Sequence, residues 1–255
     1  TITFYADAMK RLRVSQDGLS DKNQLAMAQF DDPKTIEAFV GLPSKLWAKA
    51  ERSYKTASTK RRSKELQICV QAAVAIEILI FAPMRITNLQ NLRLDQHISW
   101  QNKHAVIHIP RTQVKNDIDL VFKLPVTLSQ RIQTYIRDWR ALYTEGANPY
   151  LFPGRKMSPK DGTRLRRQIS NALWEEAGIK LSPHQFRHAA AKILLDAKPG
   201  HYEVIRKILG HKNLTTTYAH YAGAETQAAL DLYDEVILEH RKGTSFGSTQ
   251  RKGMF

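Results

Sequence analysis

The chain has 255 residues, 42% of them hydrophobic, which is enough for one large domain with a packed core. Its 39 Lys and Arg outnumber 24 Asp and Glu, and the resulting net charge of +15 predicts a polyanionic partner, because neutralising phosphates releases condensed counterions. The single cysteine, Cys69, excludes an internal disulfide and predicts a buried thiol in a reducing, cytoplasmic protein. The most apolar stretch, residues 72–84, is too short to span a bilayer, so no membrane partner is expected.

The first 62 residues are polar and mixed, with turn signals around Asp17 and Asp32. A short helix is predicted over Pro43 to Lys55, and the basic run Lys60, Arg61 and Arg62 ends the region. This run is either a solvated linker or a strap that contacts phosphates of a polyanionic partner. Because the chain begins at Thr1 rather than Met, we expect a processed or excised piece that lacks an upstream part.

A buried helix is predicted from Ser63 to Phe81, because apolar residues recur there at helical spacing, and Pro83 ends it. Strands are predicted over 98–100, 105–109 and 120–124, with the turn signal Lys115-Asn116-Asp117 between the last two. Helices follow over 128–143 and 164–177, with Gly178 as a stop, and the rest is helical to about 239. The fold class is therefore mainly α with one small antiparallel sheet. Trp139 and Trp174 are interpreted as core residues, and residues 243–255 as a flexible tail.

The segment Ser182-Pro183-His184-Gln185 has the pattern of a helix N-terminus, with Ser182 as cap and Gln185 completing a capping box. His184 is then expected in the first helical turn and Arg187 one turn onward, where free N–H groups favour a phosphate. Seen alone, this pair is typical of a solvated surface helix. His184 and His188 are four residues apart, but a zinc protease requires Glu at the position of Gln185, so we predict no metal site.

Three further positions are weak alone. Arg85 follows the buried helix in Ala82-Pro83-Met84-Arg85, where a surface ion pair is the ordinary interpretation. Lys115 lies in a polar hairpin, where lysine is common, although a mobile lysine there can protonate a leaving oxygen. His211 follows Leu209-Gly210, where Gly210 is expected to end a helix in a left-handed conformation.

In this order, with a tyrosine after His211, the set resembles the catalytic domain of the tyrosine recombinases, the phage-integrase family. The resemblance covers roughly residues 64–240. It implies that Arg85 and Arg187 clamp the scissile phosphate and that His211 adds a hydrogen bond. It also implies that His184 assists proton transfer at the nucleophile, that Lys115 is the general acid, and that a tyrosine forms a 3′-phosphotyrosine without metal, ATP or other cofactor.

The chain departs from the family pattern at three places. Pro83 stands where the family often has Gly, and Asn88 where it often has an acidic residue. The usual tyrosine position, nine residues after the histidine of Leu-Gly-His, is occupied by His220. Tyr221 is favoured as nucleophile because it needs a shift of one residue, and Tyr218 is the alternative.

The resemblance divides the chain into the end of an upstream core-binding region with a basic linker (1–62), a catalytic domain (63–242) and the tail. It implies a site-specific recombinase or integrase of a mobile element, which acts on double-stranded DNA with a specific recombination site. A homotetramer on DNA is expected. The amphipathic segment after the tyrosine either packs on its own domain or, as in this family, docks on a neighbouring protomer. The expected location is cytoplasmic, at the nucleoid of a prokaryotic or phage-derived system. Two alternatives remain open: a type IB topoisomerase, and an accessory DNA-binding protein with a decayed site.

Overall fold

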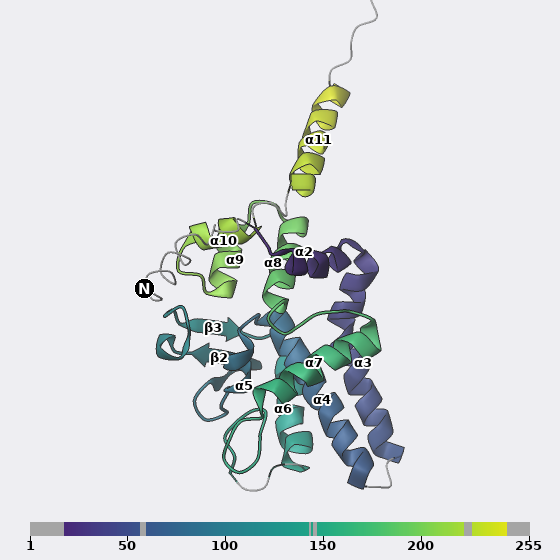
Figure 1. The fold of residues 1–255 in the computed structure, drawn as a ribbon, viewed down its shortest axis with the longest axis vertical. Helices are drawn as coiled ribbons and strands as arrows, with labels where there is room; N and C mark the ends of the chain where they lie inside the picture. Colours follow the sequence, from purple (N-terminus) through teal and green to yellow (C-terminus); the bar gives the residue numbers. More distant parts are fainter. Residues whose placement is uncertain (1–17, 57–59, 143, 145–146, 222–225, 244–255) are drawn as a thin grey trace, which may run out of the picture.

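The computed structural model describes residues 18–56, 60–142, 144, 147–221 and 226–243. These residues form a mainly helical fold with a small antiparallel sheet, as predicted (Figure 1). The helices are α2 (Asp21–Ala28), α3 (Pro33–Thr56), α4 (Lys60–Phe81), α5 (Ile86–Gln90), α6 (Val126–Thr134), α7 (Gly162–Ala177), α8 (Phe186–Ala197), α9 (Tyr202–Leu209), α10 (Leu214–Tyr221) and α11 (Thr226–Gly243). In the described part of the chain, no helix is both long and apolar enough to cross a membrane.

Helix α4 is the centre of the core. Every residue from 71 to 79 is buried, and the helix contacts α3, α6, α7 and α8, so it is covered on all sides rather than along one stripe. Two buried polar residues of α4 are paired: Gln71 accepts a hydrogen bond from Lys160, and Glu77 forms an ion pair with Arg131 of α6 at 2.5 Å. The helix ends at Phe81, and the buried segment Ala82 to Met84 connects it to Arg85.

The region before α4 is more helical than predicted. Helix α3 runs from Pro33 through Pro43 to Thr56, because Leu42, Leu46 and Ala50 pack into the same core as α4 and outweigh the hydrogen bond that Pro43 cannot make. The basic run Lys60 to Arg62 belongs to the first turn of α4, upstream of Leu66, the first residue of this helix that is buried among those whose burial is described. The side chains of this run lie outside the described residues, so its contact with DNA stays a prediction.

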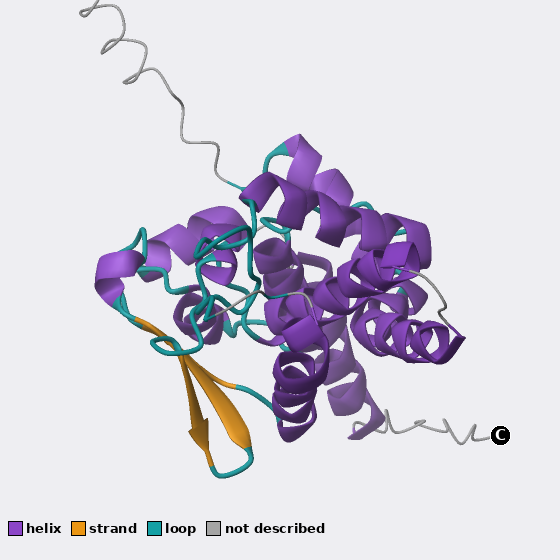
Figure 2. Ribbon diagram, turned by 90° about the horizontal axis from the view of Figure 1, so that it is seen from below, coloured by secondary structure: helices purple, strands orange, loops and turns teal. Residues whose placement is uncertain are grey.

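The predicted sheet is confirmed. Strands β1 (Ile98–Gln101), β2 (His104–Ile109) and β3 (Leu120–Lys123) are antiparallel in this order, and Ile109 pairs with Leu120. Figure 2 shows the strands at one edge of the molecule, beside the helices. The connection between β2 and β3 carries Lys115, as predicted.

The C-terminal helices have a small core of their own, formed by α8, α9 and α10 and including Tyr202, Leu209 and Tyr221. Gly178 has a φ of 69° after α7 and Gly210 a φ of 59° after α9, so both predicted glycine stops are confirmed. Residues 244–255, predicted as a tail, lie outside the described residues.

Two further predictions differ from the structure. The helix predicted over residues 128–143 is α-helical only from Val126 to Thr134 and continues as a π turn, Tyr135–Trp139, and a 3₁₀ turn, Arg140–Leu142. Trp139 is buried as predicted, whereas Trp174 is 53% exposed, because α7 packs on α3 and α4 through its other face and leaves Trp174 beside Lys180.

Candidate active site

Arg85 lies at the junction of α4 and α5. Ala82, Pro83 and Met84 are buried, and Arg85 takes an extended conformation immediately before α5 begins. Its half-buried guanidinium donates from Nη2 to Oδ1 of Asn116 over 2.8 Å, and burial lowers the pKa of Arg85. The buried segment after α4 therefore fixes the backbone of Arg85, and Asn116 positions its guanidinium.

Arg187 lies in the first turn of α8 and is only 5% exposed. Its Nη1 donates to the carbonyl of Pro83 at 2.9 Å and its Nη2 to that of Leu209 at 2.6 Å, so one guanidinium joins two segments far apart in sequence. Burial, with a smaller contribution from Arg85, lowers the pKa of Arg187 to about 10, which leaves it charged at neutral pH. Neither Arg85 nor Arg187 forms an ion pair with a carboxylate of the described residues. Two cations of this kind fit an anionic ligand.

His184 lies in a turn that precedes α8 rather than in its first helical turn as predicted. Gln185 does reach back to the N–H of Ser182 at 2.8 Å, but the Ser182 hydroxyl donates to the same oxygen and caps no helical N–H. His184 is exposed in this turn, but its ring is partly covered. This partial burial, and then the charges of Arg187, Arg85 and more distant cations, lower the pKa of His184. A neutral imidazole beside two arginines can accept a proton.

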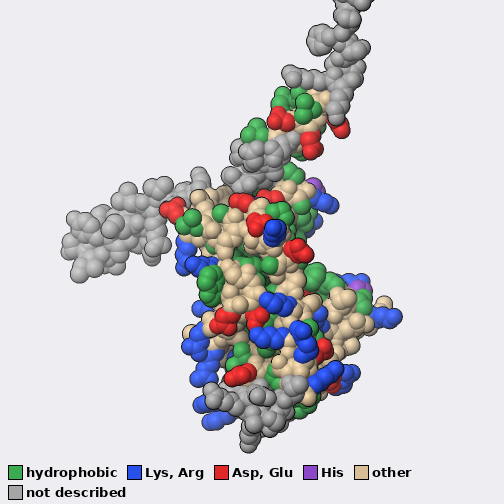
Figure 3. All heavy atoms as spheres, turned by 90° about the vertical axis from the view of Figure 1, so that its right-hand side faces the viewer, with side chains coloured by type: hydrophobic (Ala, Val, Ile, Leu, Met, Phe, Trp, Pro, Cys, Tyr) green, Lys and Arg blue, Asp and Glu red, His purple; other side chains and the backbone are tan. Residues whose placement is uncertain are grey.

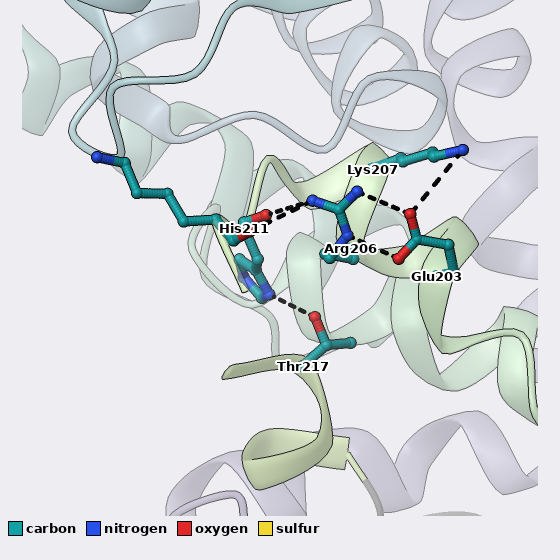
Figure 4. Close-up of polar contacts among 6 residues, drawn as sticks. Glu203, Arg206, Lys207, His211 and Thr217 are labelled. Carbon is teal, nitrogen blue, oxygen red and sulfur yellow. Dashed lines mark hydrogen bonds and ion pairs between the residues drawn. The ribbon is translucent and has the colours of Figure 1, made fainter. Parts of the chain in front are cut away.

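His211 follows the left-handed Gly210 and is 8% exposed. Figure 4 shows its ring pointing toward Thr217, whose hydroxyl lies 3.0 Å from Nδ1. The His211 carbonyl accepts a hydrogen bond from Arg206, which also pairs with Glu203, so this corner is held from both sides (Figure 4). Burial and the charge of Arg187 lower the pKa of His211 to about 4, so the ring is neutral and its Nε2 is left to contact a ligand.

Lys115 is exposed in the turn between β2 and β3. Its neighbour Asn116 connects the hairpin to the site: Oδ1 accepts from Arg85, and Nδ2 donates to the carbonyl of Gly210 over 2.7 Å. Asp117 and Lys212 form a second link at 3.4 Å. Sequence reasoning missed Asn116, because an asparagine in a turn ordinarily signals only the turn.

The two candidate tyrosines differ in environment. Tyr221 is 3% exposed, and its hydroxyl lies 2.9 Å from Nδ1 of His188. Burial raises the pKa of Tyr221, and the charge of Arg187 opposes that effect. Tyr218 is 44% exposed, and its ring stacks on Tyr202 with centroids 4.2 Å apart. The structure thus brings Tyr221, and not Tyr218, beside residues of the site.

His188 is a second residue that sequence reasoning missed, because it was considered only as a partner of His184 for a metal. Its ring contacts both His184 and Tyr221, with centroids 5.8 and 5.7 Å away. The available signal was its position next to Arg187 on α8, but nothing in the sequence showed that Tyr221 of α10 would meet it.

A model of the phage integrase family matches residues 50–228, and the chain belongs to this family. The tyrosine recombinase XerC of Brucella melitensis is 32% identical over 116 residues, which cover 43% of this chain and 35% of that protein. The tyrosine recombinase XerD of Pseudomonas putida is 30% identical over 164 residues, which cover 60% of this chain and 50% of that protein. The chain thus spans half or less of the length of these two relatives.

The fold is also similar to a solved structure. The XerH site-specific recombinase, in a post-cleavage complex with a palindromic difH substrate, superposes with a TM-score of 0.56 and 18% identity over 86% of this chain and 53% of that one. This similarity shows the fold, and together with the family match it identifies the domain as a tyrosine recombinase catalytic domain.

Proposed function

We propose that this protein is a site-specific DNA recombinase that cleaves and rejoins strands through a 3′-phosphotyrosine intermediate, without metal or ATP. One observation carries the proposal. Arg187, buried and unneutralised by any described carboxylate, is hydrogen-bonded to the segments that present Arg85 and His211, and its charge acts on Tyr221. A phosphodiester between these groups would meet two cations, a neutral imidazole and a phenol.

In the proposed reaction, Tyr221 Oη forms a bond to phosphorus while the bond from phosphorus to the 5′ oxygen breaks. The phenolic proton leaves toward His184, and the 5′ oxygen takes a proton from Lys115. Arg85, Arg187 and His211 stabilise the added charge on the non-bridging oxygens. Attack by a new 5′-hydroxyl on the phosphotyrosine reverses these steps and joins the strands.

The burial of Tyr221 beside His188 supports it as the nucleophile, since a reacting group must be held in position. Tyr218 is exposed and stacks on Tyr202, and its hydroxyl has no hydrogen bond to a histidine like that of Tyr221 among the contacts of the described residues.

We further propose that protomers assemble through α11 as a tetramer on DNA, at the nucleoid of a prokaryotic or phage-derived system. Described apolar side chains of α11 are exposed, among them Leu232, Val236 and Leu238. Figure 3 shows this helix at the top of the view, with apolar and acidic side chains exposed to solvent. An apolar groove of about 380 Å³, lined by α8, α9, Phe39 and Phe81, offers a matching surface on a neighbouring protomer.

The test is covalent trapping on nicked suicide duplexes. A random-sequence library is incubated with the protein, covalent adducts are purified, and their DNA is sequenced to find the site. We expect an adduct that Tyr221→Phe abolishes and the matched variant Tyr218→Phe retains. The reverse result would reassign the nucleophile. Relaxation of any supercoiled plasmid would favour a topoisomerase, and tight DNA binding without any adduct would favour an accessory protein.

A further inference from the structure

We propose that His188 is a catalytic hydrogen-bond donor to the attacking oxygen of Tyr221, and that Asn23 of α2 is the positioning residue that fixes the tautomer His188 needs for this. The inference rests on the proposed function in one respect only, that Tyr221 is the nucleophile. Its remaining steps follow from a hydrogen-bond chain that joins α2, the turn before α8, α8 itself and α10.

A backbone amide fixes which groups donate and which accept along this series of hydrogen bonds. The N–H of Ser182 can only donate, and it lies 2.8 Å from the side-chain oxygen Oε1 of Gln185. This contact fixes which end of the Gln185 amide is oxygen, a choice supported by the Ser182 hydroxyl at 2.9 Å from the same atom. The other end, Nε2, is therefore a donor, and it points at Oδ1 of Asn23 over 3.1 Å.

The orientation of Asn23 follows from that of Gln185. Because Oδ1 of Asn23 accepts from Gln185, its Nδ2 is the atom that faces Nε2 of His188, at 3.4 Å. An amide nitrogen has no lone pair to offer, so Nε2 of His188 must be the acceptor in this contact. A neutral His188 then carries its proton on Nδ1, which is the nitrogen 2.9 Å from the Tyr221 hydroxyl.

The surroundings keep His188 neutral. Burial lowers its pKa to about 4, and His184, His220, Arg187 and His211 act in the same direction. A neutral ring with Nδ1–H donates to Oη and cannot be the base that deprotonates Tyr221. The phenolic proton must therefore leave toward a different acceptor, which agrees with the role proposed for His184.

The consequence for catalysis is a difference between ground state and transition state. Before the reaction, Nδ1–H donates to a neutral phenol oxygen. As the proton leaves and Oη gains negative charge, the same hydrogen bond becomes charge-assisted and stronger. Burial raises the pKa of Tyr221 and so opposes phenolate formation, and the hydrogen bond from His188 counteracts this effect. His188 thereby lowers the barrier without moving. We call the series of hydrogen bonds from Ser182 through Gln185, Asn23 and His188 to Tyr221 the relay.

Asn23 lies upstream of residues 50–228, which match the family model. The relay thus draws a residue of α2 into a site whose other members lie in the matched domain. Helix α2 contacts α8 directly, and its buried Ala26 and Met27 anchor it in the core. The distal end of the relay is therefore held by packing.

The first test reads the tautomer directly in the protein without DNA. Long-range ¹H–¹⁵N correlation spectra of labelled wild-type protein at pH 7 should show His188 protonated at Nδ1 and unprotonated at Nε2. Asn171→Ala, which changes an exposed asparagine of α7, should give the same spectrum and serves as the control for changing Asn23. Asn23→Asp replaces the donor by an acceptor, and we expect the His188 proton to move to Nε2 or the ring to become doubly protonated. A wild-type ring protonated at Nε2 would overturn the proposal.

The second test measures the rate of covalent adduct formation. We expect His188→Ala to slow it by about 10- to 100-fold, as for a hydrogen bond to a charged group. His188→Asn, whose Nδ2 takes the place of the ring Nδ1, should retain most of the rate, whereas His188→Gln should not. An unchanged rate in His188→Ala, with unchanged unfolding midpoint, would refute the role. If neither the wild type nor any variant forms an adduct while the Nδ1–H tautomer is observed, the proposed function fails and the catalytic role of His188 fails with it, whereas the hydrogen-bond chain that sets the tautomer stands.

Discussion

The candidate site has a buried half and an exposed half, and they are built differently. Arg187, His211 and Tyr221 are each less than 10% exposed, and their polar atoms contact backbone carbonyls, Thr217 or His188. Lys115 and His184 are exposed in turns. The difference agrees with the proposed roles: the nucleophile and the two groups that stabilise charge at a fixed point are packed in place, whereas the proposed general base and general acid keep access to solvent.

The buried half is the more sensitive to substitution. Arg187→Gln should reduce covalent adduct formation by about 10²- to 10³-fold, the usual cost of removing one donor to a developing charge. It should also lower the free energy of unfolding by about 1–3 kcal/mol for each carbonyl left without its donor, those of Pro83 and Leu209. Trapping assays and urea unfolding measure the two effects. The exposed Arg167→Gln of α7 is the control. Equal losses of adduct formation and stability in the two variants would contradict the greater sensitivity of the buried half.

Substitutions in the exposed half should slow the reaction without changing the stability of the fold. Lys115→Ala should slow cleavage by about 10²-fold, the lower end for a general acid, with no change in the unfolding midpoint. A substrate with sulfur in place of the 5′ bridging oxygen has a leaving group that needs no proton, so it should restore the rate of Lys115→Ala but not that of Arg187→Gln. Failure of this substrate to rescue Lys115→Ala would remove the lysine from its proposed role.

Asn116 lies on the boundary between the two halves. Asn116→Ala removes the contacts with Arg85 and Gly210, and we expect about 10-fold slower cleavage with nearly unchanged DNA affinity, because both Arg85 and the hairpin lose their position. The matched variant Asp117→Asn removes the ion pair with Lys212 but leaves these contacts, and it should cleave within about threefold of wild type. A larger defect in Asp117→Asn than in Asn116→Ala would make the ion pair the principal link.

The smallest effect concerns pH. Free histidine has a pKa near 6.5, and those of His188 and His211 are lowered to about 4, so the unfolded chain binds more protons between these values. The free energy of unfolding should therefore decrease as pH falls from 6.5 to 4. Replacing the buried residue, His211→Gln, should reduce that dependence, whereas Asn171→Ala, which removes an exposed group that does not titrate, should not. Urea midpoints from pH 4.5 to 7.5 measure the slope, and parallel curves for all three proteins would contradict the prediction.

The elements that sequence reasoning predicted well are those with local causes. The glycine stops at Gly178 and Gly210 require only a left-handed residue, and the strands and their hairpin followed from alternation and turn residues. The errors have tertiary causes. Helix α3 extends through Pro43 because α4 covers it, and the turn at His184 exists because Gln185 hydrogen-bonds both Ser182 and Asn23.

By itself the sequence determined the residue types of the site, their order, and the family to which they belong. Chemistry limits those choices: few side chains bind a phosphate or attack phosphorus, and they stand in segments that a reader of one sequence can recognise. Only the tertiary structure decided that Tyr221 and not Tyr218 lies beside His188, that Asn116 joins Arg85 to Gly210, and that Asn23 reaches the site. These contacts join residues from 31 to 165 positions apart along the chain, and no local pattern encodes which distant surfaces meet when the core packs.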